Sequence, residues 1–262
     1  MKNYKILLYV FPISISVVLI KFFVFAKIKI NDQLLSNLIE SSDITIIFTG
    51  AFFVMGFLLA GVLSDFKESE KIPGEIASNL EAIQDWIYLA FKAPRTGTSD
   101  LCKETLSKDY LKSTMEKGSN EILYWLNSKE KDSMKIFPLI RQYNAIAYYF
   151  AERGVDKEAI KGIQENTNAM RKQLTRAYTI SRTTFVGPAY TLVKSILVLT
   201  VLLLLLTKFK SLSADIFVTL SLSFLFFYIY FLVLNLDNPF DAEYKVDLKP
   251  IDRFIKRLSH DF

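Results

Sequence analysis

Long apolar runs alternate with polar stretches along this chain. Each run covers about twenty residues, the length at which a helix crosses the roughly 30 Å hydrocarbon core of a bilayer. The runs extend over residues 6–26, 44–63, 186–207 and 216–236. The pattern predicts an all-α integral membrane protein with four transmembrane helices and a large polar region between the second and the third.

The polar region 67–185 also has a helical pattern. Its apolar residues recur at intervals of three and four, and no alternating strand pattern is present. The three predicted stripes are Ile76, Leu80, Ile83 and Ile87; Phe137, Ile140 and Ala147; and Ile163, Met170 and Leu174. Pro73 with Gly74, Gly118 and Gly154 are interpreted as helix ends. The region is therefore predicted to be helical, with its first and last helices continuing the adjacent spans.

These patterns divide the chain into a first span pair in 1–66, a helical region in 67–185, a second span pair in 186–236 and a tail in 237–262. The tail places Ile251, Phe254, Ile255 and Leu258 on one face of a predicted helix, which could lie on the membrane but which we expect to dock on the helical region. The first run is longer than the apolar part of a signal peptide and lacks a cleavage site, so it is predicted to be a retained span. We expect Lys21, near its far end, to extend to the membrane interface.

The charge distribution predicts the orientation. The formal net charge is +5 and the pI is about 9.0, and the region 67–185 is rich in lysine and arginine. By the positive-inside tendency, both termini and this region are expected on the cytoplasmic side. The basic excess is typical of segments beside anionic lipid, so no nucleic-acid partner is predicted.

Composition excludes several kinds of chemistry. The chain has one cysteine, Cys102, and one histidine, His260, which rules out an internal disulfide and an ordinary Cys/His metal site. No Ser/His/Asp or Cys/His arrangement, phosphate-cradling glycine loop or carboxylate pair is present. We therefore predict no enzyme, no metal and no cofactor.

Two motifs carry a resemblance to a known family. FTGAFFVMGF in the second run, followed by DF and then Ile72-Pro73, resembles the pore helix of bestrophins, and LDNPF at Leu236 to Phe240 resembles the Asn-Pro-Phe step after their last span. The order of spans and helical region agrees over nearly the whole chain. The chain is most similar to the bacterial bestrophin-like family of unknown function. This resemblance implies a homo-oligomer, namely a pentamer, that conducts inorganic anions across the bacterial inner membrane.

Candidate functional residues follow from this resemblance. Phe48, Phe52 and Phe57 are candidates for a hydrophobic neck that gates by dewetting. Phe48 and Phe52 share one helix face and Phe53 and Phe57 another, so one pair is expected to line the axis while the other packs on a neighbouring helix. Further candidates are Gly56 and Ala60 for close helix approach, Asp65 and Lys194 as pore-mouth or intramembrane charges, and Asn238, Pro239 and Phe240 as the step after the last span.

Three alternatives to this assignment remain open. Both pairs of phenylalanines are also compatible with an ordinary core. A stator-type proton-channel subunit has the same order of spans but needs a carboxylate-bearing partner, and a non-conducting scaffold or sensor would instead bind a protein through its helical region.

Calcium gating is not expected, because Lys245 lies among the acidic residues Asp241, Glu243 and Asp247.

Overall fold

The computed structural model describes residues 5–27, 41–92, 107–129, 131–182, 187–207, 209, 211–237, 239–240 and 245–261. All regular elements in these ranges are helices, which confirms the predicted class. They are α1 (Lys5–Lys27), α3 (Ser41–Lys92), α4 (Lys108–Asn127), the short 3-10 helix η2 (Ser133–Lys135), α5 (Ile136–Glu152), α6 (Lys157–Arg182), α7 (Gly187–Leu206), α8 (Leu212–Leu236) and α9 (Lys249–Asp261).

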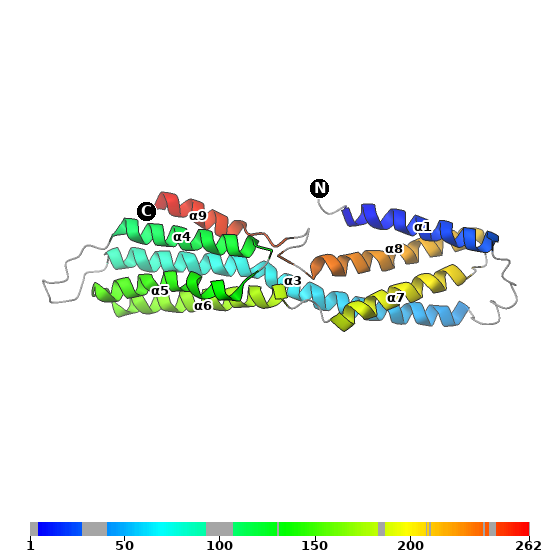
Figure 1. The fold of residues 1–262 in the computed structure, drawn as a ribbon, viewed down its shortest axis with the longest axis horizontal. Coiled ribbons are helices and arrows are strands. Elements are labelled where there is room, and N and C mark those ends of the chain that lie inside the picture. The colour runs from blue at the N-terminus through cyan, green and yellow to red at the C-terminus, as the bar shows by residue number, and fades with distance from the viewer. Residues whose placement is uncertain are drawn as a thin grey trace. The chain divides into compact units, whose positions relative to one another are not determined.

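The chain forms two compact units, and one of them contains the predicted spans. This membrane unit combines α1, the part of α3 up to Phe66, α7 and α8. All four helices are long and apolar enough to cross a membrane. Within the unit α8 packs against both α1 and α7, as Figure 1 shows. The structure thus confirms four membrane-spanning helices.

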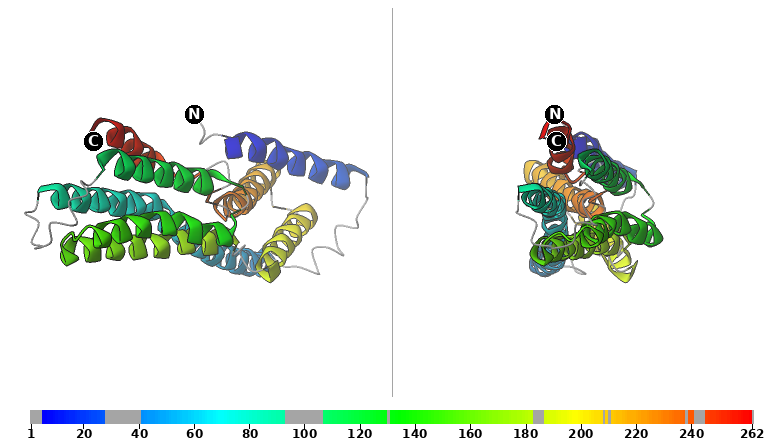
Figure 2. Two further views of the ribbon diagram at one scale, coloured as in Figure 1. Left: turned by 60° about the vertical axis from the view of Figure 1, so that its left-hand side comes forward. Right: turned by 90° about the vertical axis from the view of Figure 1, so that its left-hand side faces the viewer.

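The second unit, called here the helical unit, combines α3 from Lys67 onward with α4, α5, α6 and α9. Figure 2 shows these helices as a bundle around the later part of α3. Two predicted apolar stripes are confirmed, because their seven residues are completely buried: Ile76, Leu80, Ile83, Ile87, Ile163, Met170 and Leu174. In the remaining stripe the prediction is wrong for Phe137, which is 64% exposed, because the buried face of α5 runs through Leu139, Ile140 and Tyr143.

Pro73 and Gly74 do not end a helix, contrary to the prediction. They lie inside the 52-residue α3, which runs without interruption through both units. Ile72 and Ile76 on either side of Pro73 are buried in the helical unit. Packing of this stripe offsets the backbone hydrogen bond that proline removes. Continuity of α3 also confirms that the first helix of the helical region extends the second span.

Gly118 likewise lies inside α4 rather than at its end. A Cβ atom there would come within 2.8 Å of the Tyr143 hydroxyl, so the glycine permits close packing of α4 on α5. Gly154, in contrast, follows α5 with a φ of 65°, which agrees with the predicted helix end. The expected docking of the tail is also confirmed, because Ile251, Phe254 and Leu258 of α9 are buried in the core of the helical unit.

Tyr143 leads to a prediction about alkaline stability. Its side chain is completely buried and its hydroxyl lies 3.2 Å from the Ser119 hydroxyl. Burial raises the pKa of the Tyr143 hydroxyl above its ordinary value. Above about pH 10 the unfolded chain therefore loses this proton first, and stability falls as pH rises. We expect Tyr143→Phe to reduce the steepness of this alkaline loss.

Circular dichroism of the full chain in detergent, titrated from neutral to alkaline pH, measures this effect. Tyr143→Phe also removes one hydrogen bond, which lowers stability by about 1 kcal/mol at neutral pH. Tyr124→Phe is the matched control, because Tyr124 is 75% exposed. Equal alkaline slopes for Tyr143→Phe and the unchanged protein would contradict the prediction.

Candidate functional site

One pair of phenylalanines on α3 packs inside the membrane unit. The Phe48 side chain is 7% exposed, and its ring centroid lies 6.3 Å from that of Phe226 on α8. The Phe52 ring stacks on Phe226 with a centroid separation of 4.3 Å. Phe226 is completely buried. Phe48 and Phe52 therefore hold α3 against α8 within a single chain.

The other pair points away from this packing. Phe53 and Phe57 are each 75% exposed, although both lie in a segment apolar enough to cross a membrane. Small residues lie near them along the helix, and among the described residues no atom lies within 4 Å of a Cβ atom added at Gly50 or Gly56. We call this surface the outward face of α3, and it consists of Ile46, Gly50, Phe53, Phe57, Ala60, Gly61 and Ser64.

Gly56 and Ala60 are both exposed in the single chain, as are Asp65 and Lys194. Since both are exposed among the described residues, their predicted packing role requires a helix from another molecule. Asp65 follows the apolar part of α3, and Lys194 lies within α7. Their predicted roles as pore-mouth and intramembrane charges stay predictions.

Pro239 and Phe240, which follow the last span, belong to the helical unit. Asn238 lies outside the described residues. Pro239 accepts a hydrogen bond at its carbonyl from the Val246 backbone N–H at 2.8 Å. Phe240 is 4% exposed, and the ammonium of Lys131 lies 4.8 Å from the centre of its ring. In this structure Pro239 and Phe240 of LDNPF fix the chain to the core of the helical unit.

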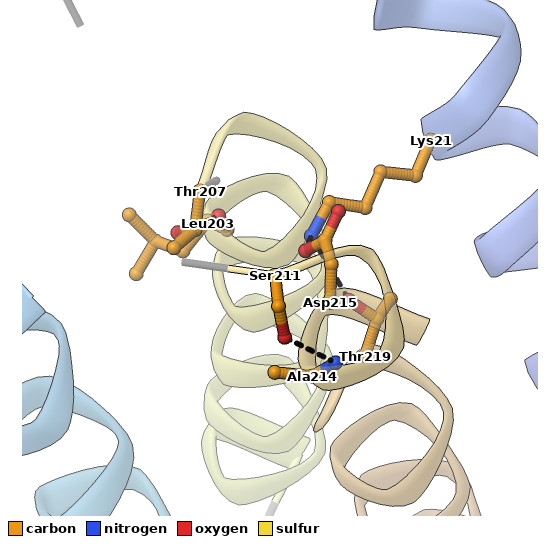
Figure 3. A network of polar contacts seen from close by, with 7 residues as sticks. All are labelled: Lys21, Leu203, Thr207, Ser211, Ala214, Asp215 and Thr219. Carbon is orange, nitrogen blue, oxygen red and sulfur yellow. Dashed lines mark hydrogen bonds and ion pairs between the residues drawn. The ribbon is translucent and has the colours of Figure 1, made fainter. Parts of the chain in front are cut away.

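The membrane unit contains a buried ion pair. Its lysine, Lys21, is the one that the sequence predicts to extend to the membrane interface. The Lys21 side chain of α1 is 1% exposed, and its Nζ lies 2.6 Å from Asp215 Oδ1 on α8. The same ammonium donates to the Thr219 hydroxyl at 2.9 Å. Figure 3 shows Lys21 extending from α1 toward these two side chains. The expectation that the Lys21 side chain extends to the membrane interface is thus wrong, because the side chain is buried against α8.

The sequence contained a signal for this pair. Asp215 directly precedes the fourth apolar run, and Lys21 lies near the end of the first, so two opposite charges occur at the ends of two apolar segments. In the structure α8 begins at Leu212, and Asp215 lies in its first turn. Ser211 caps this turn by accepting a hydrogen bond from the Ala214 backbone N–H at 3.2 Å (Figure 3).

The opposite end of α8 carries a second polar contact. The Tyr190 hydroxyl of α7 donates a hydrogen bond to the carboxylate of Asp237, which caps α8. Polar contacts therefore connect α8 to α1 at its beginning and to α7 at its end. Among the described residues no group of three His, Cys, Asp or Glu side chains lies in an arrangement that could hold a metal ion.

No protein-family model matches the chain, and no curated protein matches it in sequence. The fold, however, is similar to crystal structures of a bacterial bestrophin homologue from Klebsiella pneumoniae. One of these is 13% identical in sequence with a TM-score of 0.75, and the match covers 97% of both chains. The structure of a substituted form of that homologue is 12% identical, again with a TM-score of 0.75 and 97% coverage of both chains. The likeness shows that this chain has the bestrophin fold.

Proposed function

We propose that this chain is the subunit of an oligomeric ion channel in which the outward face of α3 surrounds the ion path. The observation that supports this most directly is the 75% exposure of both Phe53 and Phe57 on a helix that crosses the membrane. The bestrophin fold agrees with a channel, because the solved structures it matches include a bacterial bestrophin homologue.

The composition of the outward face favours contact with other copies of the chain. Lipid tails solvate leucine or isoleucine as well as they solvate phenylalanine, so a lipid-facing surface has no need of small residues. Gly50, Ala60 and Gly61 instead permit helices to approach closely, which favours association of several α3 helices around an axis. The copies form a homo-oligomer, with a pentamer as the expected number.

In this arrangement the two pairs of phenylalanines have different roles. Phe53 and Phe57 form the hydrophobic neck, where narrow apolar walls exclude water and block ions until the neck widens. Phe48 and Phe52, which the sequence analysis also names as neck candidates, do not line the neck. They pack on Phe226 of α8 and thereby hold α3 in place. Of the three predicted neck residues, Phe57 keeps its assignment, and Phe53 replaces the other two.

The same proposal includes orientation and selectivity. Both termini and the helical unit lie in the cytoplasm of a bacterium, with the spans in its inner membrane, in accordance with the many Lys and Arg residues between the second and third spans. The permeant ions are small inorganic anions, as the resemblance to bestrophins implies. Asp65 and Lys194 are proposed to adjust the ion concentration at the ends of the path.

Reconstitution of the purified full chain in planar bilayers tests the proposal. The subunit number is first determined by light scattering in detergent. Current is then recorded in asymmetric potassium chloride, where the sign of the reversal potential distinguishes chloride from potassium conduction. We expect unitary currents that reverse near the chloride equilibrium potential. An intact oligomer that passes no current at any salt concentration or voltage would exclude the channel and favour a scaffold or sensor.

A further inference from the structure

The ion pair between Lys21 and Asp215 is unusual because it is buried in the part of the molecule that crosses the membrane. A lysine in this environment costs several kcal/mol unless its charge is paired and its hydrogen-bond donors are satisfied. The exposed fractions of Lys21 and Asp215 are only 1% and 8%. Loss of either charge would therefore leave the other buried without compensation.

The geometry satisfies the lysine ammonium almost completely. Two of its protons are directed to Asp215 Oδ1 at 2.6 Å and Thr219 Oγ1 at 2.9 Å. The Phe209 ring centre lies 5.1 Å from the same nitrogen, within the range of a cation–π interaction. Since hydrogen bonds from an ammonium are directional, this set of partners fixes both the rotation and the axial position of α8 relative to α1.

The partners of Lys21 lie on the same face of α8 as Phe226. Asp215, Thr219, Ser223 and Phe226 follow one another on α8 at intervals of four, four and three residues, and all four are buried. They therefore form one stripe along the helix. Rotation of α8 that moves Asp215 away from Lys21 also moves Phe226 away from Phe52, on which it stacks.

We propose that Lys21, Asp215 and Thr219 form an intramembrane lock, by which we mean a set of polar contacts that fixes the rotation of α8. The lock thereby holds Phe226 against Phe48 and Phe52 of α3. The lock acts within one chain and does not require the chain to conduct ions. Apolar packing alone gives little rotational preference between helices in lipid, because lipid and protein are equally apolar there. The ion pair supplies this directional preference.

The experiment uses two measurements on the full chain in detergent, neither of which depends on ion conduction. The first is the temperature at which half of the protein is lost from the main peak in size-exclusion chromatography after heating. We expect Lys21→Met and Asp215→Asn each to lower it by roughly 10 °C. We expect the double variant Lys21→Met with Asp215→Leu to recover most of this loss, because no unpaired charge remains buried.

The second measurement reports the position of α8 rather than stability. Ser223 is completely buried on the stripe between Thr219 and Phe226. Ser223→Cys, in a chain that carries Cys102→Ser, introduces a buried thiol whose reaction with a membrane-permeant maleimide is expected to be slow. In the stable double variant at positions 21 and 215, we expect several-fold faster labelling, because α8 is free to rotate.

Lys194→Met is the matched control, since Lys194 lies in a span but is exposed, and it should change neither measurement. Normal heat stability of Asp215→Asn would show that the pair does not lock the helices. If the double variant recovers its heat stability but the thiol introduced at position 223 is still labelled slowly, the ion pair stabilises the chain without positioning α8. Either result overturns the proposal, and absence of ion current in the unchanged protein would affect only the proposed function.

Discussion

Phe57→Ala is expected to raise the open probability of the reconstituted channel several-fold. The Phe57 ring is 75% exposed on the outward face of α3, so its removal widens the proposed neck without taking a ring from the core of the chain. A wider constriction holds water more readily, and the barrier to ion entry falls. Phe53→Ala should act in the same direction, and the double variant should leak ions at all voltages. Single-channel recording in planar bilayers measures each variant.

Phe217→Ala provides the matched control for this experiment. Phe217 is 71% exposed but lies on α8 and not on the outward face of α3, which is proposed to surround the ion path. The control should therefore conduct like the unchanged protein. Phe52→Ala has a different expected effect, because it removes the ring stacked on Phe226 and should lower stability. Identical gating in Phe57→Ala and Phe217→Ala would exclude Phe57 from the neck.

Gly162→Leu is expected to lower the free energy of unfolding of the helical unit by about 3 kcal/mol or more. Gly162 lies on α6, and a Cβ atom at this position would come within 2.2 Å of the Trp86 ring on α3. A leucine requires still more space, so α6 must move away from α3 or Trp86 must leave its site. Thermal unfolding of the full chain, followed by circular dichroism, measures the loss.

Gly74→Leu is the matched control, because Gly74 also lies inside a helix but no atom in the described part of the chain lies within 4 Å of an added Cβ. Leucine has a higher helix propensity than glycine, so this control should be neutral or stabilising by up to about 1 kcal/mol. Gly162→Ala should fall between the two. Equal unfolding temperatures for Gly162→Leu and Gly74→Leu would contradict the role of close α3–α6 packing.

Much of the fold of the helical unit follows from the sequence, because a helix with one face buried and the other in water has a clear periodic pattern of apolar and polar residues. The stripe from Ile76 to Ile87 is buried as predicted, since polar residues separate its members. The prediction for Phe137 is wrong because α5 carries apolar residues on more than one face. The sequence predicts a helix end at Pro73 because local backbone chemistry opposes a helix there, whereas the packing of distant residues decides the outcome.

The candidate site was less predictable because inside a membrane both lipid-facing and protein-facing surfaces are apolar. The spacing of Phe48, Phe52, Phe53 and Phe57 revealed two faces of α3 but not which of them packs within the chain. Phe226, far away in sequence, decides this by stacking on Phe52. The sequence likewise does not show whether Lys21 or Lys194 is buried in the protein. Only the position of Asp215 on α8 shows that it is Lys21.

The contact between Trp86 and Gly162 gives the chain a useful spectroscopic property. The protein contains two tryptophans, and both Trp86 and Trp125 lie in the helical unit. Trp125 donates its indole N–H to the Asp132 carbonyl at 3.0 Å, so its surroundings also change when this unit opens. Intrinsic tryptophan fluorescence therefore reports the folding of the helical unit, while the four membrane-spanning segments contribute no tryptophan emission of their own.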